Sequence, residues 1–201
     1  VPIVFVHGVG LTHEIWQPQL EFFNYHSTLA YDILGHGKSS LKKREITFDD
    51  FSEQLIELID HLNIKKIHLV GFSIGSLIAR NFATKFNDRL QSLVLLGSIY
   101  KRTEEQQKIV NQRFEQAKQE LKLSKQALKR WFTDKYLEIN PKIYEKISSI
   151  LSANNMNNFL KVYELFVKHK NDEDFNKITA STLVMTGEYD IGSTVKMSQE
   201  L

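Results

Sequence analysis

One pentapeptide limits the folds open to this chain more than any other feature. Residues 71–75 read Gly-Phe-Ser-Ile-Gly, directly after the apolar run Lys66 to Val70 and before a helical pattern. A tight turn between a strand and a helix holds its middle residue in a strained conformation, and flanking glycines remove side chains that would collide with neighbouring elements. Such a turn would expose the Ser73 hydroxyl beside a helix N-terminus, which favours negative charge. Ser73 is therefore the candidate nucleophile, with a glycine-rich packing turn as the alternative interpretation.

Short apolar runs alternate with helical patterns along the first half of the chain. This order is typical of βα units, so we expect an α/β fold with a mainly parallel sheet and flanking helices. Thr47 followed by Asp50 predicts the start of one helix, because this spacing can form a capping box. A second helix should follow Ser73. The predicted strands are Ile3 to Val6, Thr28 to Ile33, Lys66 to Val70, Leu93 to Leu96 and Ser181 to Thr186.

The composition changes between Tyr100 and Lys177. Glycine disappears, Lys, Gln and Glu dominate, and apolar residues recur with helical spacing. We expect a core domain over residues 1–99, a helical lid insertion over 100–178 and a return to the core over 179–201. A solvated helical subdomain that does not line the substrate pocket fits the same pattern. The apolar anchors of the insertion are expected to be Phe114, Leu121, Leu128, Trp131 and Phe132.

Composition and charge narrow the range of partners. Of 201 residues, 42% are hydrophobic and 25% charged, which is enough apolar material for a sizeable core. A formal net charge of only +2 gives no reason to expect nucleic acid or a membrane surface as partner. The chain has no cysteine, which excludes disulfides and a cysteine nucleophile, and no apolar run approaches the ~20 residues that cross a bilayer. Cytoplasm is the default location, and the oligomeric state stays open.

Two backbone amides are the candidates for stabilising an oxyanion. Acyl transfer passes through a tetrahedral anion, and one preset donor is worth roughly 3 to 4 kcal/mol. Ile74 follows the nucleophile and should supply one N–H. Val9 should supply the other from the loop 7–10, His-Gly-Val-Gly, because the glycines let the backbone turn inward. His7 stands at a strand end, where we expect it to orient the loop by hydrogen bonding instead of transferring protons.

Asp190 is the candidate acid. A serine hydroxyl needs a histidine to take its proton, and that histidine needs a carboxylate to orient it. When the serine lies in the turn of such a strand–turn–helix motif, the chain order is serine, acid, histidine. Asp190 lies in the loop after the last predicted strand, whereas Glu188 lies closer to the strand end and is the weaker candidate. A structural turn aspartate is the alternative interpretation of Asp190.

No histidine follows Asp190, since the last of the seven is His169 in the insertion. We therefore expect a fold that is incomplete at both ends. The chain begins inside a predicted strand, and it should stop before the last strand, the last helix and a catalytic histidine beyond Leu201. A degenerate, non-catalytic relative is the alternative. Truncation is favoured because Ser73, both amide-donating loops and Asp190 occur together.

These motifs resemble those of the α/β-hydrolase superfamily, and they look most like 3-oxoadipate enol-lactonases and related esterases. The resemblance covers nearly the whole chain and rests on residues 7–10, 32–39, 71–75 and 186–194. Residues 186–194 and 130–133 are the ones that favour the lactonase branch. The resemblance implies a small-molecule ester or lactone as substrate and no cofactor.

The sequence thus predicts a serine hydrolase that cleaves carboxylic ester or lactone bonds by Ser-His-Asp acyl-enzyme chemistry, with 3-oxoadipate enol-lactone as one candidate substrate. The alternatives are a non-enzymatic ligand-binding protein, an acyltransferase and a cofactor-free haloperoxidase. Nucleotide binding at Gly37-Lys38-Ser39 is disfavoured because Asp32 stands where a P-loop needs glycine. No His-Glu-x-x-His spacing indicates a metal. The positive charge of the insertion favours an acidic substrate.

Overall fold

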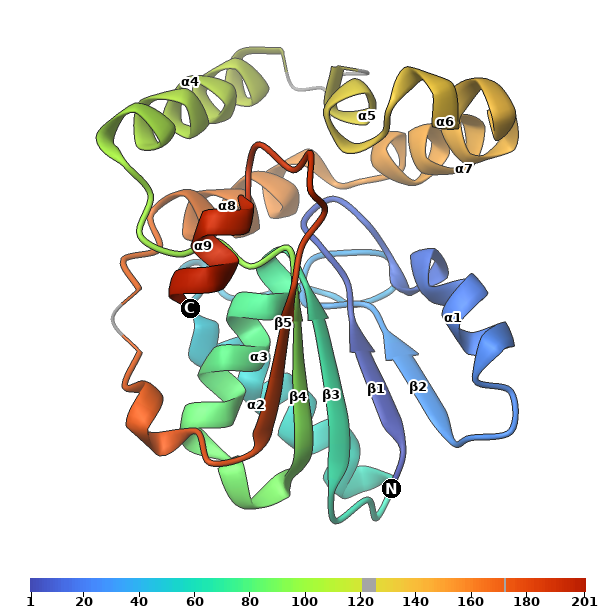
Figure 1. Cartoon of the computed structure of the whole chain (residues 1–201), viewed down its shortest axis with the longest axis vertical. Helices are drawn as coiled ribbons and strands as arrows, with labels where there is room; N and C mark the ends of the chain where they lie inside the picture. Colours follow the sequence, from blue (N-terminus) through green and yellow to red (C-terminus); the bar gives the residue numbers. More distant parts are fainter. Residues whose placement is uncertain (121–125, 172) are drawn as a thin grey trace.

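The central element is a parallel β-sheet (Figure 1). The structure, a computed structural model, describes residues 1–120, 126–171 and 173–201. Within these ranges five strands run in the order β2-β1-β3-β4-β5, and every neighbouring pair is parallel. The predicted α/β fold with a mainly parallel sheet is thereby confirmed. The strands are β1 Ile3–Val6, β2 Thr28–Tyr31, β3 Ile67–Phe72, β4 Leu90–Leu96 and β5 Ser181–Met185.

Strand β2 is shorter than the sequence predicts. It ends at Tyr31 instead of Ile33, one residue before Asp32, and the chain turns over residues 33–36, where the His36 N–H donates to the Ile33 carbonyl at 3.0 Å. The carboxylate of this aspartate accepts the backbone N–H of His13 at 2.8 Å and that of Lys38 at 3.0 Å. The two loops that follow β1 and β2 are thus tied together at the carboxyl edge of the sheet.

Two helices form most of the buried layer against the sheet. Helix α3 (Ile74–Lys85) lies against β1, β3 and β4, and α2 (Phe48–His61) packs on α3. The predicted start of α2 is confirmed, since the Thr47 backbone N–H donates to the Asp50 carboxylate at 2.8 Å. Each large apolar side chain buried here contributes about 1.5–3 kcal/mol. The core includes Val4, Val6, Phe51, Leu55, Ile59, Leu69, Ile78, Phe82, Leu93 and Leu95.

The shorter helices connect and flank these elements. The 3-10 turn η1 (His13–Trp16) and helix α1 (Gln17–Phe22) lie beside β2, and α9 (Val195–Glu200) follows β5 (Figure 1). The 3-10 turns η2 (Asn87–Arg89) and η3 (Phe175–Lys177) lead into β4 and β5. Along the described part of the chain, no helix is both long and apolar enough to cross a membrane.

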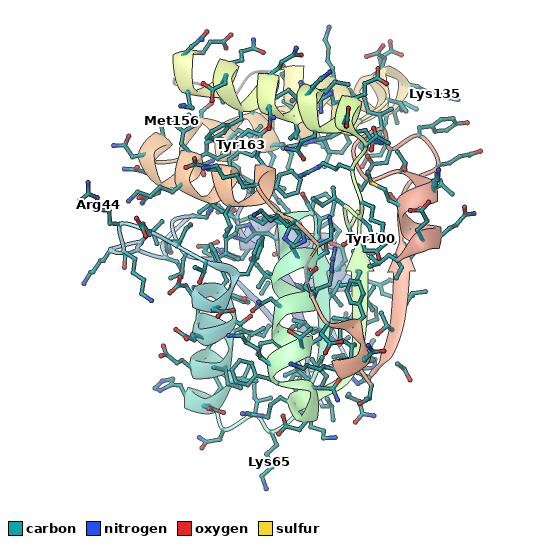
Figure 2. The ribbon with its side chains drawn as sticks, turned by 90° about the vertical axis from the view of Figure 1, so that its left-hand side faces the viewer. Arg44, Lys65, Tyr100, Lys135, Met156 and Tyr163 are labelled. Atoms are coloured by element: carbon teal, nitrogen blue, oxygen red, sulfur yellow. The ribbon has the colours of Figure 1, made fainter. Side chains whose placement is uncertain are left out.

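A group of helices between β4 and β5 lies over the carboxyl ends of the strands (Figure 1). Helix α4 packs along α8, where the rings of Phe114 and Tyr163 lie 5.5 Å apart, and Figure 2 shows Tyr163 between these two helices. A lid function for this group stays a prediction, as does the division at residues 99 and 178. The helices are α4 Glu104–Glu120, α5 Gln126–Trp131, α6 Asp134–Ile139, α7 Pro141–Ser152 and α8 Met156–Val167.

The apolar anchors predicted for this group have different environments. Phe114 and Leu128 are buried, as expected, and Phe132 is half-buried. Trp131 is 45% exposed, because it faces a cavity instead of a helix interface. Leu121 lies outside the described residues.

Candidate active site

Ser73 occupies a strained turn between β3 and α3. Its backbone angles are φ 56° and ψ −120°, in a region that costs a non-glycine residue about 1–3 kcal/mol. The turn is held from both sides, because the Ser73 N–H donates to the Leu96 carbonyl at 2.9 Å and its own carbonyl accepts the Ser76 N–H at 2.9 Å. The strained strand–turn–helix geometry that the pentapeptide predicts is therefore present.

The two flanking glycines make this turn sterically possible. A Cβ atom at Gly75 would lie 2.4 Å from the Val6 carbonyl oxygen and 2.7 Å from that of His7. A Cβ atom at Gly71 would lie 2.2 Å from the Gly75 oxygen. Backbone atoms cannot move aside as the end of a long side chain can, so both positions require glycine. The same close approach sets the loop after β1 against the first turn of α3.

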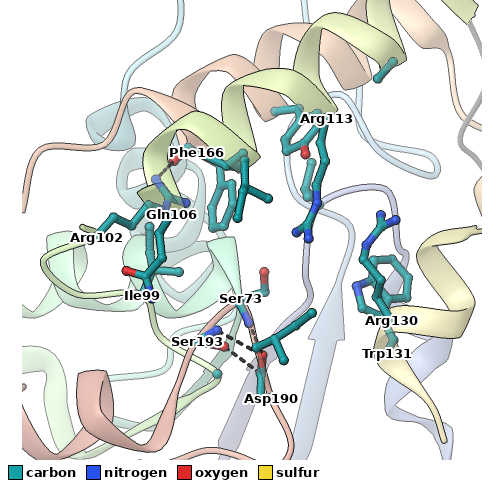
Figure 3. Close-up of a pocket in the computed structure, with 18 of the residues that line it drawn as sticks. Ser73, Ile99, Arg102, Gln106, Arg113, Arg130, Trp131, Phe166, Asp190 and Ser193 are labelled. Atoms are coloured by element: carbon teal, nitrogen blue, oxygen red, sulfur yellow. Dashed lines mark hydrogen bonds between the residues drawn. The ribbon is translucent and has the colours of Figure 1, made fainter. Parts of the chain in front are cut away.

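A cavity of about 320 Å³ lies between the sheet and the helices above it. Val9, Ser73 and Asp190 all line it, and Figure 3 shows the Ser73 hydroxyl directed into the open space. This volume is at the lower end of the range for small-molecule sites. Much of the wall is apolar, with contributions from Phe72, Ile109, Val110, Trp131, Phe159 and Phe166.

Asp190 reaches this cavity from the loop after β5. Two hydrogen bonds join the ends of β3, β4 and β5 here. The Ser73 N–H donates to the end of β4, and the Gly97 N–H donates at 2.8 Å to the Met185 carbonyl at the end of β5. A Cβ atom at Gly97 would lie 3.4 Å from the Phe72 ring and 3.8 Å from Asp190 Oδ2, so the aspartate and the serine turn flank the same glycine. Ser73 and Asp190 are thus brought together at one edge of the sheet.

The Asp190 carboxylate is oriented by its own loop. Oδ1 accepts the backbone N–H groups of Gly192 at 2.7 Å and Ser193 at 2.9 Å, and Oδ2 accepts the Ser193 hydroxyl at 2.7 Å. Glu188 is exposed and is not among the residues that line the described cavity. The geometry therefore favours Asp190 over Glu188 as the acid.

The two candidate amide donors lie on either side of the serine. Val9 lines the cavity from the loop after β1, and a Cβ atom at its neighbour Gly8 would lie 3.3 Å from Ser73 Cβ. Ile74 begins α3, so its backbone N–H belongs to a helix N-terminus, while its side chain is fully buried. The fold places both predicted residues next to Ser73, and their role as oxyanion donors stays a proposal.

His7 and His36 hold the loop that carries Val9. Ile33 N–H donates to His7 Nε2 at 3.0 Å, so Nδ1 carries the ring proton and donates to the Gly8 carbonyl at 2.8 Å. Gly10 N–H donates to His36 Nε2 at 2.8 Å. Burial is the main reason that the pKa of His7 falls to about 3 and that of His36 to about 4. His7 therefore orients the loop, as the sequence predicts.

These neutral histidines predict acid sensitivity. Their ordinary pKa is about 6.5, so below that pH the unfolded chain binds protons that the folded protein does not. The free energy of unfolding should then fall as the pH drops from about 6.5 to 4, by on the order of 1 kcal/mol per pH unit for each histidine. Urea denaturation at a series of pH values measures this slope. His36→Gln should reduce it by about half, and a free energy that stays constant between pH 6.5 and 5 would contradict the prediction.

Among the described residues that line the cavity, none is a histidine, although the chain has seven. The His169 side chain is buried elsewhere, with Nε2 3.2 Å from a Glu173 carboxylate oxygen, and His13 Nδ1 lies 2.8 Å from Asp32. The structure therefore brings together the predicted nucleophile, acid and amide donors without a histidine base. A base beyond Leu201 stays a prediction.

Sequence reasoning missed the arginines that line the cavity. Arg102, Arg113 and Arg130 all contribute to its wall. The positive charge of the insertion was only a general signal for these arginines. Helical spacing was a more specific signal for Arg113, because residues three or four apart lie on one face of a helix. Val110, Arg113 and Ala117 have this spacing and line the cavity from one face of α4. In the described ranges, no group of three or more His, Asp or Glu residues could hold a metal ion.

Comparison with known proteins gives the family. The profile of the alpha/beta hydrolase fold family matches residues 1–198. A hydrolase from Acinetobacter baylyi, (E)-2-((N-methylformamido)methylene)succinate hydrolase, is 32% identical over 100% of this chain and 76% of its own length. 3-Oxoadipate enol-lactonase 2 of the same organism is 26% identical over 99% of this chain and 75% of its own. The crystal structure of the enol-lactonase from Burkholderia xenovorans shares the fold, with a TM-score of 0.82 at 22% identity over 99% of this chain and 77% of that one. The chain belongs to the α/β-hydrolase family.

Proposed function

We propose that the protein is a serine hydrolase that cleaves carboxylic ester or lactone bonds through an acyl-enzyme. Ser73 is the nucleophile, Asp190 the acid, and the backbone N–H groups of Val9 and Ile74 are the oxyanion donors. One observation carries the proposal: a serine with φ 56° at the start of a helix opens into a cavity that Asp190 also lines. 3-Oxoadipate enol-lactone is a candidate substrate within this class.

The proposed reaction has two halves. Ser73 Oγ attacks the carbonyl carbon, its proton passes to the histidine base predicted beyond Leu201, and negative charge collects on the carbonyl oxygen beside the two amides. The bond to the leaving oxygen then breaks, and the histidine returns the proton to that oxygen. Water next attacks the acyl-enzyme through the same base, which releases the carboxylic acid and restores the Ser73 hydroxyl.

The names of the relatives support this reaction class. The relative at 32% identity is named as a hydrolase and the one at 26% as an enol-lactonase. An enol-lactone is a cyclic ester, so an activated serine with preset amide donors suits its cleavage. The apolar cavity wall would exclude water from the first half of the reaction and strengthen each electrostatic contact.

A fluorophosphonate probe tests the proposal, because it reacts covalently with an activated serine. We expect the protein expressed from its complete reading frame to be labelled and the Ser73→Ala variant to remain unlabelled. Ser40→Ala is the control, since Ser40 is exposed and lies in the loop before α2. Mass spectrometry of the labelled peptide should place the adduct on Ser73. Labelling that survives Ser73→Ala would refute the assignment of the nucleophile.

A ligand-binding protein without catalysis is the second candidate. The observation that favours it is the lack of a histidine along the described cavity wall. The same experiment separates the two, because a binding protein would bind small molecules in this cavity but leave Ser73 unlabelled.

A further inference from the structure

Two arginines meet above the candidate nucleophile. Arg113 extends from α4 and Arg130 from α5, and Figure 3 shows both guanidinium groups directed toward the same space over Ser73. Arg113 is half-buried and Arg130 is exposed, so solvent and ligands can reach both of them. The two cations therefore stand on the side of the cavity opposite the reacting hydroxyl.

Neither arginine has a counterion within the described structure. Two carboxylates line the same cavity, and each is bound elsewhere: Glu120 accepts the Gln116 side-chain amide at 2.7 Å, and Asp190 accepts donors from its own loop. No ion pair or hydrogen bond joins Arg113 or Arg130 to a described residue. This arrangement leaves two guanidinium forks free to bind a ligand.

Arg102, the third arginine of the cavity, serves a different purpose. It donates to the carbonyls of Phe166 and Val167, both at 3.2 Å, and its guanidinium carbon lies 4.6 Å from the centre of the Phe166 ring. These contacts tie the segment before α4 to the end of α8. Arg102 thus stabilises the helices through Nη1, and its buried Nη2 has no hydrogen-bond partner among the described residues.

The nearness of these cations shifts the pKa values of the groups around them. Desolvation lowers the pKa of Arg130, and the positive charge of Arg113 lowers it further. Burial raises the pKa of Tyr163, and the charges of Arg113, Arg130 and Arg102 all act against that rise. Guanidinium groups stay protonated at neutral pH despite such shifts. Two like charges held together next to an apolar wall are stabilised when an anion binds between them.

We propose that Arg113 and Arg130 bind a free carboxylate of the substrate while Ser73 attacks an ester or lactone carbonyl elsewhere in the same molecule. The planar guanidinium fork matches a carboxylate in two-point geometry, which a neutral ester group cannot reproduce. The proposal rests on the hydrolase function proposed above and narrows its substrates to small esters or lactones that carry a carboxylate. The cavity of about 320 Å³ suits a compact molecule with the two groups a few bonds apart.

Binding to a Ser73→Ala form of the complete protein tests this without catalysis. Calorimetric titration compares monoethyl succinate, which carries one carboxylate, with diethyl succinate, which carries none. We expect the monoester to bind at least about tenfold more tightly, and Arg113→Gln or Arg130→Gln to remove about that factor for the monoester alone. Arg113→Lys should restore only part of the affinity, because an ammonium is a point charge without the fork. Arg44→Gln is the matched control for net charge, since Arg44 is exposed at the periphery, away from the cavity (Figure 2).

The outcomes separate this proposal from the hydrolase function. Equal affinity for the two succinates overturns the carboxylate site, even when a fluorophosphonate labels Ser73 in the unmutated protein. A monoester preference that persists in both glutamine variants, or is lost equally in Arg44→Gln, overturns it as well. A preference that depends on Arg113 and Arg130 supports the site, and it does so even when Ser73 is never labelled and the hydrolase function fails.

Discussion

Replacing Gly75 with alanine is expected to lower the melting temperature by more than about 10 °C, because the new methyl group overlaps backbone atoms. Its carbon would lie 2.4 Å from the Val6 carbonyl oxygen and 2.7 Å from that of His7, well inside contact distance. Relief would require α3 to move away from β1, which separates the layers that form the core. Differential scanning calorimetry of the two proteins measures the change.

Gly187→Ala is the matched control for this substitution. Nothing lies within 4 Å of a Cβ atom at Gly187, and its φ is outside the positive region that disfavours side chains. The control should therefore melt within about 2 °C of the unmutated protein. If both alanine variants melted alike, the close approach of α3 to β1 would be wrong.

The effect of Gly75→Ala should extend to the site, because the same contact positions both proposed amide donors. Gly75 stands one residue after Ile74, and the carbonyls it approaches belong to the strand and loop that lead to Val9. After correction for the fraction of molecules that are folded, the variant should still react with a fluorophosphonate more slowly than the unmutated protein does.

The sheet and the serine turn could be predicted because their signals are local. A β-strand followed by a glycine-flanked serine and a helix is encoded within about ten residues, and steric rules leave few conformations for it. Asp190 was predictable for a related reason: a loop after a parallel strand must open at the carboxyl edge of the sheet, where Ser73 also lies. The positions of Val9 and Ile74 were predictable for the same reason, because both residues come shortly after strands that end at this edge.

The ends of strands and the cavity wall depend on distant contacts. The chain leaves β2 after Tyr31, and Asp32 then receives an N–H group from His13, in the loop after β1, and one from Lys38, further along its own loop. Trp131 has the spacing of a buried anchor, yet it faces a cavity that forms only once the helices are placed over the sheet. The meeting of Arg113 and Arg130 is likewise a product of how α4 and α5 pack, which no local pattern encodes.

Asp190→Asn should lower kcat for ester hydrolysis by about 10⁴-fold in the protein expressed from its complete reading frame. The amide has no charge to stabilise a protonated histidine, and it can present an N–H where the histidine needs an acceptor, which selects the wrong ring tautomer. The fold should tolerate the change. The asparagine oxygen can still accept the N–H groups of Gly192 and Ser193, and the Ser193 hydroxyl can rotate to accept the new amide N–H.

Glu188→Gln makes the same change in charge two residues away and provides the control. Glu188 is exposed and does not line the described cavity, so its kcat should stay within about twofold of the unmutated protein. Steady-state hydrolysis of a nitrophenyl ester, with melting temperatures measured alongside, compares the variants at equal folded concentration. A larger loss in Glu188→Gln than in Asp190→Asn would transfer the role of the acid to Glu188. Full activity in Asp190→Asn would leave the ordered carboxylate with a purely structural role, because an amide of the same shape can replace an aspartate that only accepts hydrogen bonds within its own loop.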